Sequence, residues 1–131
     1  MKYEFEALSG QIIEAALAVH RELGPGFLES VYESALKVAF RHRGIMYASQ
    51  PQVQIYFENE EVGEHRLDLI VEDQIVVELK AVKAFEAIHF ATVKSYLKAT
   101  RLSVGLLFNF NATKLIVKRI VPSDPSYSSP E

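Results

Sequence analysis

Charged residues interrupt two apolar runs in the middle of the chain. Residues 65–82 read H-R-L-D-L-I-V-E-D-Q-I-V-V-E-L-K-A-V and are rich in Leu, Ile and Val, as buried strands are. Asp68, Glu78 and Lys80 stand inside these runs. Burying a charge in a sheet is costly unless the charge is paired or binds a metal. This conflict between apolar strand and charge indicates where chemistry would take place.

The spacing of these charges predicts which of them meet. If residues 72–74 form a three-residue loop between two antiparallel strands, Asp68 lies opposite Glu78 on one face of the sheet. Lys80 shares that face, because residues two apart in a strand point the same way. A two-residue loop would shift the register by one residue and place Asp68 and Glu78 on opposite faces. The sequence permits either loop, and the chemistry depends on the longer one.

Two facing carboxylates repel each other unless a cation lies between them. Carboxylate oxygens suit Mg²⁺ or Mn²⁺, and such an ion can polarise a phosphodiester, activate a water and stabilise the leaving oxygen. Lys80 could orient or deprotonate that water, or neutralise charge in the transition state. The alternative is a structural network in which Lys80 bridges Asp68 and Glu78, since opposed acid and lysine commonly form a cross-strand ion pair.

Two helices are predicted ahead of these strands. Apolar residues recur with helical spacing over residues 8–23, where Ser9 is a candidate N-cap, and over residues 27–42, which Gly44 follows as a candidate C-cap. Glu29 lies inside the edge of the apolar stripe of the second helix. Facing inward it needs a cation or a metal, whereas the alternative is a solvated glutamate favoured by the helix dipole. If this helix packs along the strands, Glu29 supplies a third carboxylate.

The rest of the chain predicts four more elements. Alternation predicts a half-buried strand at residues 53–57, and a third helix is expected over residues 85–99. Buried strands are expected at 103–108 and 115–121, with a turn at 109–111 after the first of them. The order is therefore α-α-β-β-β-α-β-β. A strand, a crossover helix and a strand predict a parallel pair beside an antiparallel one, hence an α/β (α+β) fold with a mixed sheet of about five strands flanked by helices.

Composition bounds the class of protein. With 131 residues, 49% apolar residues and no cysteine, the chain is expected to form one domain over residues 1–121, without disulfides or thiolate metal sites. Residues 122–131, rich in Pro and Ser, are expected to be disordered. No segment approaches the roughly 18 apolar residues of a membrane span, and the first residues lack the apolar run of a signal peptide. We therefore expect a cytoplasmic protein with no membrane partner.

The net charge of −3 gives no general attraction to nucleic acid. Nucleic-acid binding would need a local basic patch instead. The candidate residues for such a patch are Lys83, Lys94, Lys98, Lys114 and Arg119. A merely solvated surface is the alternative reading of these side chains, and scattered lysines would favour a protein partner over nucleic acid.

Several blocks of the sequence resemble one known family. Residues 26–32, G-F-L-E-S-V-Y, fit the G-x-x-E-x-x-Y pattern that gives the GxxExxY protein family its name. The blocks R-L-D-L-I-V-E-D, V-V-E-L-K-A-V and G-L-L-F-N-F-N also look like that family, in the same order. The resemblance covers residues 8–121. Because the family is assigned to the PD-(D/E)XK nuclease-like superfamily, it implies a restriction-endonuclease-like core and divalent-metal-dependent phosphodiester hydrolysis, with DNA expected ahead of RNA.

The resemblance also implies roles for individual residues. Asp68 resembles the strand aspartate of the superfamily, and Glu78 and Lys80 resemble its E-x-K pair. Glu29 resembles the helical glutamate of exonuclease-like branches. Glu29, Asp68 and Glu78 would hold Mg²⁺ or Mn²⁺ together with the backbone carbonyl of Leu79, and Lys80 would act on the attacking water.

The chain departs from the family pattern at two places. Family members often carry H-x-A-Q on the helix after the E-x-K strand; here His89 is kept, but Thr92 replaces the glutamine and is too short to make the same contacts. Leu67 precedes Asp68 where the superfamily's name has proline. Tyr32, His89 and Thr92 are further candidates for contacting substrate or supporting the metal ligands. A second hypothesis follows: a non-catalytic, nuclease-like module that binds nucleic acid or a protein partner, with homo-oligomerisation also open.

Overall fold

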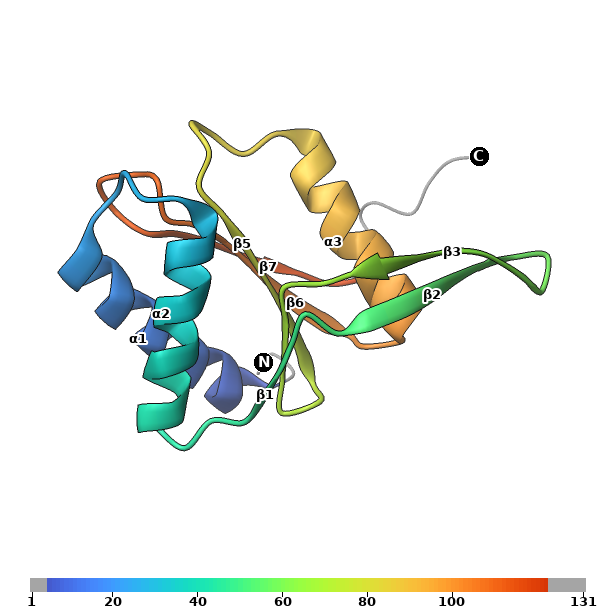
Figure 1. Ribbon diagram of the computed structural model, residues 1–131, viewed down its shortest axis with the longest axis horizontal. Helices are drawn as coiled ribbons and strands as arrows, with labels where there is room; N and C mark the ends of the chain where they lie inside the picture. Colours follow the sequence, from blue (N-terminus) through green and yellow to red (C-terminus); the bar gives the residue numbers. More distant parts are fainter. Residues whose placement is uncertain (1–4, 123–131) are drawn as a thin grey trace.

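A five-stranded mixed sheet forms the centre of the molecule. Its strands are β1 (Tyr47–Ser49), β4 (Leu69–Val71), β5 (Ile75–Lys80), β6 (Val104–Asn109) and β7 (Ile116–Ile120). In the computed structural model, which describes residues 5–122, they lie in the order β1-β4-β5-β6-β7 (Figure 1). The pair β5–β6 is parallel and the other pairs are antiparallel. The predicted mixed sheet with a parallel pair is confirmed.

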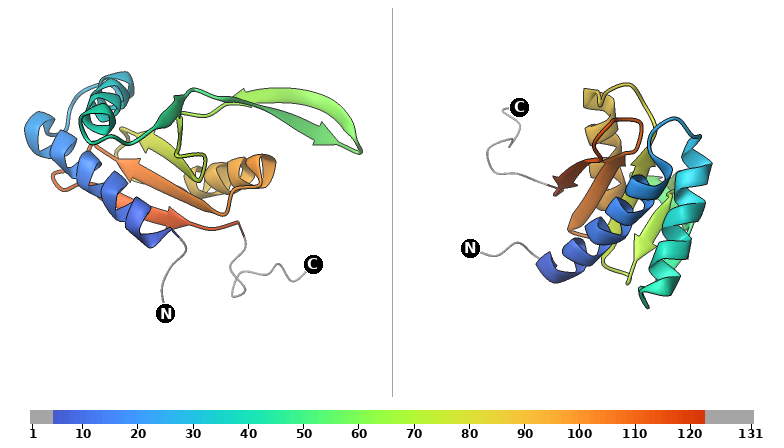
Figure 2. Two further views of the ribbon diagram at one scale, coloured as in Figure 1. Left: turned by 90° about the horizontal axis from the view of Figure 1, so that it is seen from below. Right: turned by 90° about the vertical axis from the view of Figure 1, so that its left-hand side faces the viewer.

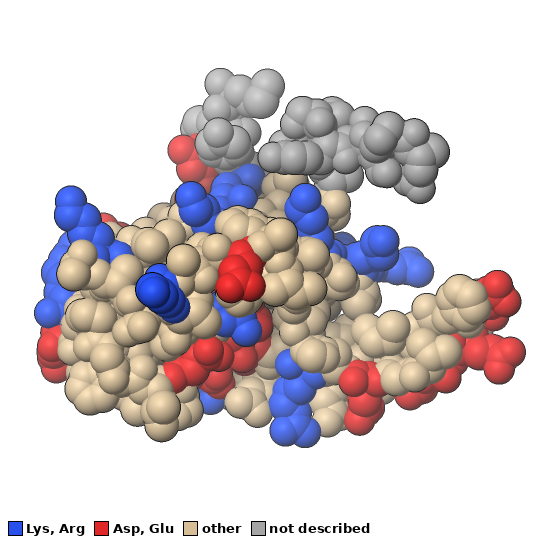
Figure 3. Space-filling model, turned by 90° about the horizontal axis from the view of Figure 1, so that it is seen from above, with Lys and Arg blue, Asp and Glu red and all other residues tan. Residues whose placement is uncertain are grey.

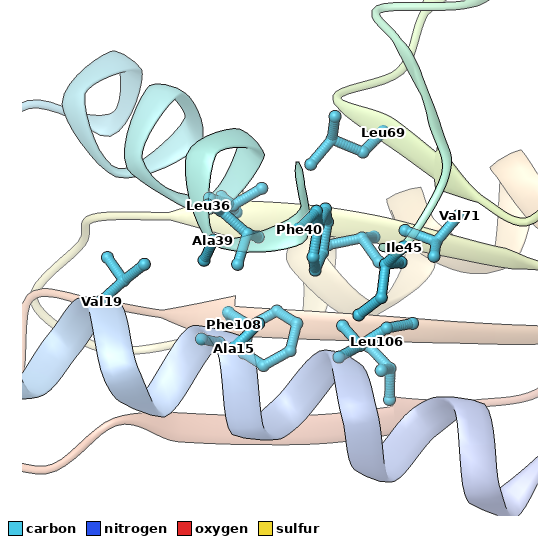
Figure 4. Packing of buried hydrophobic residues seen from close by; sticks show 14 of the residues in the cluster. Ala15, Val19, Leu36, Ala39, Phe40, Ile45, Leu69, Val71, Leu106 and Phe108 are labelled. Atoms are coloured by element: carbon cyan, nitrogen blue, oxygen red, sulfur yellow. The ribbon is translucent and has the colours of Figure 1, made fainter. Parts of the chain in front are cut away.

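Helices cover both faces of this sheet. Two of them, α1 (Glu6–Leu23) and α2 (Glu29–His42), pack on one face, and α3 (Ala87–Thr100) packs on the other (Figure 2). The larger apolar cluster lies under α1 and α2, where Leu36 and Phe40 point toward Phe108 and other sheet residues (Figure 4). Because strand side chains alternate, neighbouring residues of β5 enter different clusters.

The helix boundaries differ from the prediction at the start of α1. The helix begins one turn earlier than Ser9 suggested, because Phe5 packs against the larger apolar cluster and acts as the N-cap residue. Ser9 lies inside the helix instead, buried, and its Oγ has no hydrogen-bond partner within the described chain. The predicted stop of the second helix is confirmed: the helix ends at His42, and Gly44 follows with a φ of +68°.

The two strands between β1 and β4 form a separate ribbon. β2 (Gln52–Phe57) and β3 (Glu60–Arg66) pair with each other alone and extend away from the body of the molecule (Figures 1 and 2). The predicted strand at 53–57 is confirmed as part of β2, but its predicted half-burial is wrong, because only Val53 of β2 is partly buried. Neither β1 nor β3 was expected. Alternation of apolar and polar residues indicates a strand without indicating what covers its apolar face.

The hairpin of β4 and β5 has the longer of the two connections considered. Leu69 pairs with Val77 and Val71 with Ile75, which leaves residues 72–74 as a three-residue loop. This register puts Asp68, just before β4, at the level of Glu78. The register on which the predicted chemistry depends is therefore confirmed.

Two further expectations concern the ends and the surroundings of the chain. Residues 122–131 were expected to be disordered, and all of them except residue 122 lie outside the described part of the chain. None of the helices in the described part of the chain is long and apolar enough to span a bilayer.

A close approach of α3 to β6 yields a stability prediction. A Cβ added at Gly105 would lie 2.7 Å from Cγ1 of Val93, so Gly105→Ala forces one of the two elements to shift. We expect this variant to lower the free energy of unfolding by about 1–3 kcal/mol, as overpacking does. The measurement is equilibrium unfolding in urea.

The matched control is Gly10→Ala in α1, where an added Cβ meets nothing within 4 Å. It should stabilise the chain by about 0.5–1 kcal/mol, because alanine replaces a helical glycine. Similar changes in the two variants would contradict close packing at Gly105.

Candidate active site

Two carboxylates and a lysine converge at the carboxyl end of β5. Asp68 lies in the bend before β4, and its Oδ2 accepts a hydrogen bond of 2.9 Å from the backbone N–H of Leu79. The Oε2 of Glu78 lies 3.9 Å from the Nζ of Lys80. The fold therefore brings together three of the four residues predicted to be catalytic, from two neighbouring strands.

Glu78 is the most constrained of these groups. Its side chain is 7% exposed, and its Oε1 is buried with no hydrogen-bond partner in the described structure. Burial, followed by the charge of Asp68, raises the pKa of Glu78 to about 8, while Lys80 opposes the rise. An ionised carboxylate without a partner is costly in such a place. A cation would supply the contact that this buried acceptor lacks.

Asp68 lies in the same environment as Glu78. Burial raises its pKa, and the hydrogen bond from Leu79 lowers it. The charges of Glu33 and Glu29 on α2 raise it further. The acidic residues that influence this site therefore include Glu29 and Glu33 on α2, in addition to the carboxylates of the two strands.

Glu29 is the first residue of α2 and its side chain is exposed. It is nevertheless close enough for its charge to raise the pKa of both Asp68 and Glu78. The start of α2 thus lies near the strand carboxylates. Glu29 is solvated, which is one of the two alternatives considered for it, and its role as a metal ligand stays a prediction.

A chain of contacts through Tyr32 joins the start of α2 to the end of β5. The buried Tyr32 donates a hydrogen bond to the Gly24 carbonyl (2.6 Å) and accepts one from the Phe27 N–H (3.1 Å). Its ring stacks on Phe110 at 4.7 Å between centroids, and the Phe110 N–H bonds the Lys80 carbonyl at 2.9 Å. Tyr32 therefore supports the loop that leads into α2 at Glu29, and a contact of Tyr32 with substrate stays a prediction.

His89 and Thr92 both bond to the backbone of their own helix. The Nδ1 of His89 accepts a hydrogen bond of 2.9 Å from the Glu86 N–H, as part of the cap of α3. The Thr92 hydroxyl donates to the Ile88 carbonyl at 2.8 Å. Each side chain thus stabilises the first turns of α3, and their roles toward a substrate remain predictions.

Three contributors to the site were not predicted from the sequence. Glu33 stands one turn after Glu29, and its charge has a larger effect on the pKa of Asp68 than that of Glu29. It is ion-paired with Lys37 at 3.3 Å and accepts a hydrogen bond from Gln50. The i, i+4 spacing from Glu29 was the pattern that could have revealed it.

Tyr96 and Asn109 are the other two. Burial, and then the charges of Glu78 and Asp68, raise the pKa of Tyr96 to about 12, and its hydroxyl pairs with Nε2 of His65 on the ribbon at 2.5 Å. Asn109 was expected in a turn but is the buried last residue of β6. Its side chain bonds both the N–H and the carbonyl of Val82. Only long-range pairing reveals these contacts, so local patterns missed them.

The donor set fits a hard divalent cation. Within residues 5–122 no group of three His, Asp, Glu or Cys side chains is gathered closely enough to hold a metal ion. Two carboxylates meet, however, and one of their oxygens is buried without a partner. Oxygen ligands of this kind suit Mg²⁺ or Mn²⁺. The upper face of the molecule shows carboxylates gathered near its centre, with scattered basic side chains around them (Figure 3).

The protein has a mixed sheet with helices on both faces, and its Asp and E-x-K side chains converge from adjacent segments of that sheet. This combination defines a nuclease-like α+β protein. The profile of the PD-(D/E)XK nuclease superfamily matches residues 6–120, and the chain belongs to this superfamily. The narrower assignment to the GxxExxY family remains a prediction.

One solved structure, described as the crystal structure of SSO0001, is similar to this chain with a TM-score of 0.58 and 17% sequence identity. The match covers 93% of this chain and 62% of that one, so the chain spans less than two thirds of its relative. At this identity the likeness supports the fold alone. A search of curated proteins gave no match.

The raised pKa of Glu78 predicts how stability changes with pH. Between its ordinary pKa of 4.5 and about 8, the unfolded chain has released this proton while the folded chain keeps it. The folded state binds more protons, so the free energy of unfolding falls as pH rises through this window, by at most about 1.4 kcal/mol per pH unit for one proton. Urea unfolding in the presence of EDTA measures the slope.

Glu78→Gln should give a shallower slope, and the exposed Glu14→Gln on α1 should leave it unchanged. A slope that is the same in Glu78→Gln and in the wild type would contradict the burial of an ionisable Glu78.

Proposed function

We propose that this chain hydrolyses phosphodiester bonds in nucleic acid, with DNA expected ahead of RNA, and that it requires Mg²⁺ or Mn²⁺. The observation that carries the proposal is the buried Glu78, whose Oε1 has no partner in the described structure and whose neighbour is a second carboxylate. Membership of the superfamily supports it, because PD-(D/E)XK nucleases generally use divalent metals.

The metal would be held by Asp68 and Glu78, with Glu29 and the Leu79 carbonyl as the further ligands. When bound, the ion supplies Lewis-acid polarisation of the phosphodiester and a water that is more acidic than in bulk solvent. Because the pKa of Glu78 is raised to about 8, this carboxyl must give up a proton when it becomes a ligand near neutral pH.

Lys80 would act on the substrate side of the site. Its side chain is 25% exposed, so the ammonium is reachable from solvent while Glu78 beside it is not. A cation in this position can neutralise charge on a phosphate or orient the attacking water. The backbone around Lys80 is held by the Phe110 N–H and by the Asn109–Val82 pair, so the ammonium is carried by a fixed strand end.

One observation favours the second candidate, a module that binds without cutting. The Thr92 hydroxyl donates to the backbone of its own helix at the position of the family's glutamine, so the contacts of that glutamine are missing. Such a module would keep the fold and the carboxylates and would hold nucleic acid or a protein partner.

A nuclease assay with a matched variant separates the two candidates. Purified protein is incubated with plasmid and with linear DNA, with Mg²⁺, Mn²⁺ or EDTA. We expect cleavage that needs the metal, and a loss of about 100-fold or more in Glu78→Gln, as for removal of a group that acts in the transition state. Glu14→Gln, on the far helix α1, should retain wild-type activity.

Equal activity in the wild type and in Glu78→Gln would mean a contaminating nuclease and would refute the proposal. A wild-type chain that cuts neither substrate but binds DNA, with an affinity that falls steeply with salt, would instead support the binding module.

A further inference from the structure

The base of the β2–β3 ribbon faces α3 on the same side of the sheet as Glu78. Val76 of β5 packs in the apolar cluster under α3, and because strand side chains alternate, Glu78 and Lys80 lie on that same face. Val53 of β2 packs against this cluster as well, and His65 is its cross-strand partner on β3. The ribbon therefore brings His65 to the side of the sheet that carries the charged groups of the site.

Tyr96 of α3 holds His65 in this position. The Nε2 of His65 lies 2.5 Å from the Tyr96 hydroxyl, and the centroids of the two rings are 4.8 Å apart. The charges of Glu78 and Asp68 both raise the pKa of Tyr96. His65 therefore contacts a residue whose ionisation is influenced by both of the proposed metal ligands, although His65 itself belongs to the ribbon.

The Tyr96 hydroxyl also determines which nitrogen of the neutral His65 ring carries the proton. Tyr96 is buried, and with a pKa of about 12 its hydroxyl keeps its proton at neutral pH. A buried hydroxyl needs an acceptor, and within residues 5–122 its hydrogen-bond partner is Nε2 of His65. Because Nε2 accepts, the proton of the neutral ring lies on Nδ1. His65 is exposed, and none of the described residues bonds Nδ1, so this N–H is open to a ligand.

The charges along the ribbon limit where a phosphate can lie. The charged residues of its outer part are all acidic: Glu58, Glu60 and Glu61. Acidic side chains line the ribbon in Figure 3, and they repel phosphates. At the base, Glu64 and Arg66 flank His65 with opposite charges. The Lys80 ammonium, 25% exposed, attracts phosphate to the face that His65 shares. A phosphate is therefore favoured at the base of the ribbon and disfavoured at its outer end.

We propose that His65 is a substrate-binding residue of this site, and that its Nδ1–H donates a hydrogen bond to a phosphate oxygen of the bound nucleic-acid strand. Hydrogen bonds to charged phosphate oxygens are stronger than those between neutral groups. Tyr96 keeps the ring in place and keeps its proton on Nδ1. The inference rests on nucleic acid being the substrate, as in the proposed function, and it makes the base of the ribbon part of the site.

A matched set of substitutions separates the two nitrogens of His65. His65→Asn keeps a donor near the position of Nδ1 but is too short to reach Tyr96, whereas His65→Gln places its amide near the position of Nε2 and lacks a donor at Nδ1. His65→Ala removes both contacts.

Cleavage kinetics with Mg²⁺ are measured on fluorescein-labelled DNA, both single-stranded and duplex. We expect KM to rise about tenfold or more in His65→Ala and His65→Gln, and to stay within about threefold of the wild type in His65→Asn, because only the asparagine keeps the bond to the phosphate. The kcat values should stay close to that of the wild type, since the contact is equally strong before and in the transition state. The Kd for the same DNA, from fluorescence anisotropy in EDTA, should follow the order of the KM values.

The control is Val62→Ala, an exposed ribbon residue that should keep the wild-type KM and Kd. Circular dichroism shows whether each variant is folded. Rescue by His65→Gln instead of His65→Asn would overturn the proposal, because His65 would then act only through Tyr96. Equal defects in all three variants, a change in kcat at unchanged KM, or wild-type KM and Kd in His65→Ala would overturn it too.

Failure of the proposed function is distinguishable from failure of this inference. A wild-type chain that binds DNA without cutting it refutes the hydrolysis alone, and the Kd values of the variants then decide the role of His65. A wild-type chain that neither binds nor cuts DNA overturns both.

Discussion

Two like charges that share one buried place are the constraint on which this structure depends. The carboxylates of Asp68 and Glu78 come from adjacent strands, and both have raised pKa values, chiefly because burial disfavours their charged forms. A site built only for stability would use apolar residues here, since an uncompensated buried charge is strongly destabilising. Lys80 compensates one side of Glu78 and leaves the other oxygen without a partner. The electrostatic cost is small when the Glu78 carboxyl is protonated. When this carboxyl is ionised, a divalent cation can offset the cost.

The surrounding elements hold these groups in place from three directions. The three-residue loop sets the register of β4 on β5, so Asp68 reaches the Leu79 N–H. The Asn109 side chain holds the chain at Val82, directly beyond the strand end that carries Lys80. Stacking of Tyr32 on Phe110 ties the start of α2 to the same strand end and brings the charges of two glutamates toward the site. The geometry therefore depends on contacts between segments that are far apart in the sequence.

The parts that the sequence predicted are those governed by local spacing or by the family resemblance. The loop length, the shared face of Glu78 and Lys80, the parallel pair of strands and the three helices could all be inferred from residue patterns. The ribbon could not, because alternation in β2 does not reveal that its apolar face lacks a covering element. The roles of Asn109 and Tyr96 were also hidden, because each acts through a partner many residues away. The prediction of Ser9 as the N-cap of α1 was wrong, because Phe5, which lies outside the apolar pattern, is the N-cap and the helix begins at Glu6.

The central claim is that the carboxylates of Asp68 and Glu78 share a divalent cation, and a crystal structure with Mn²⁺ tests it most directly. Crystals would be grown above pH 8, where Glu78 is ionised, and the anomalous signal of manganese would locate the ion. We expect an anomalous peak in contact with both carboxylates, and we expect it to be lost in Glu78→Gln crystals treated in the same way. Wild-type crystals with no peak there, and with Lys80 bridging Asp68 and Glu78 instead, would contradict a shared cation and leave a structural network of charges in place of a metal site.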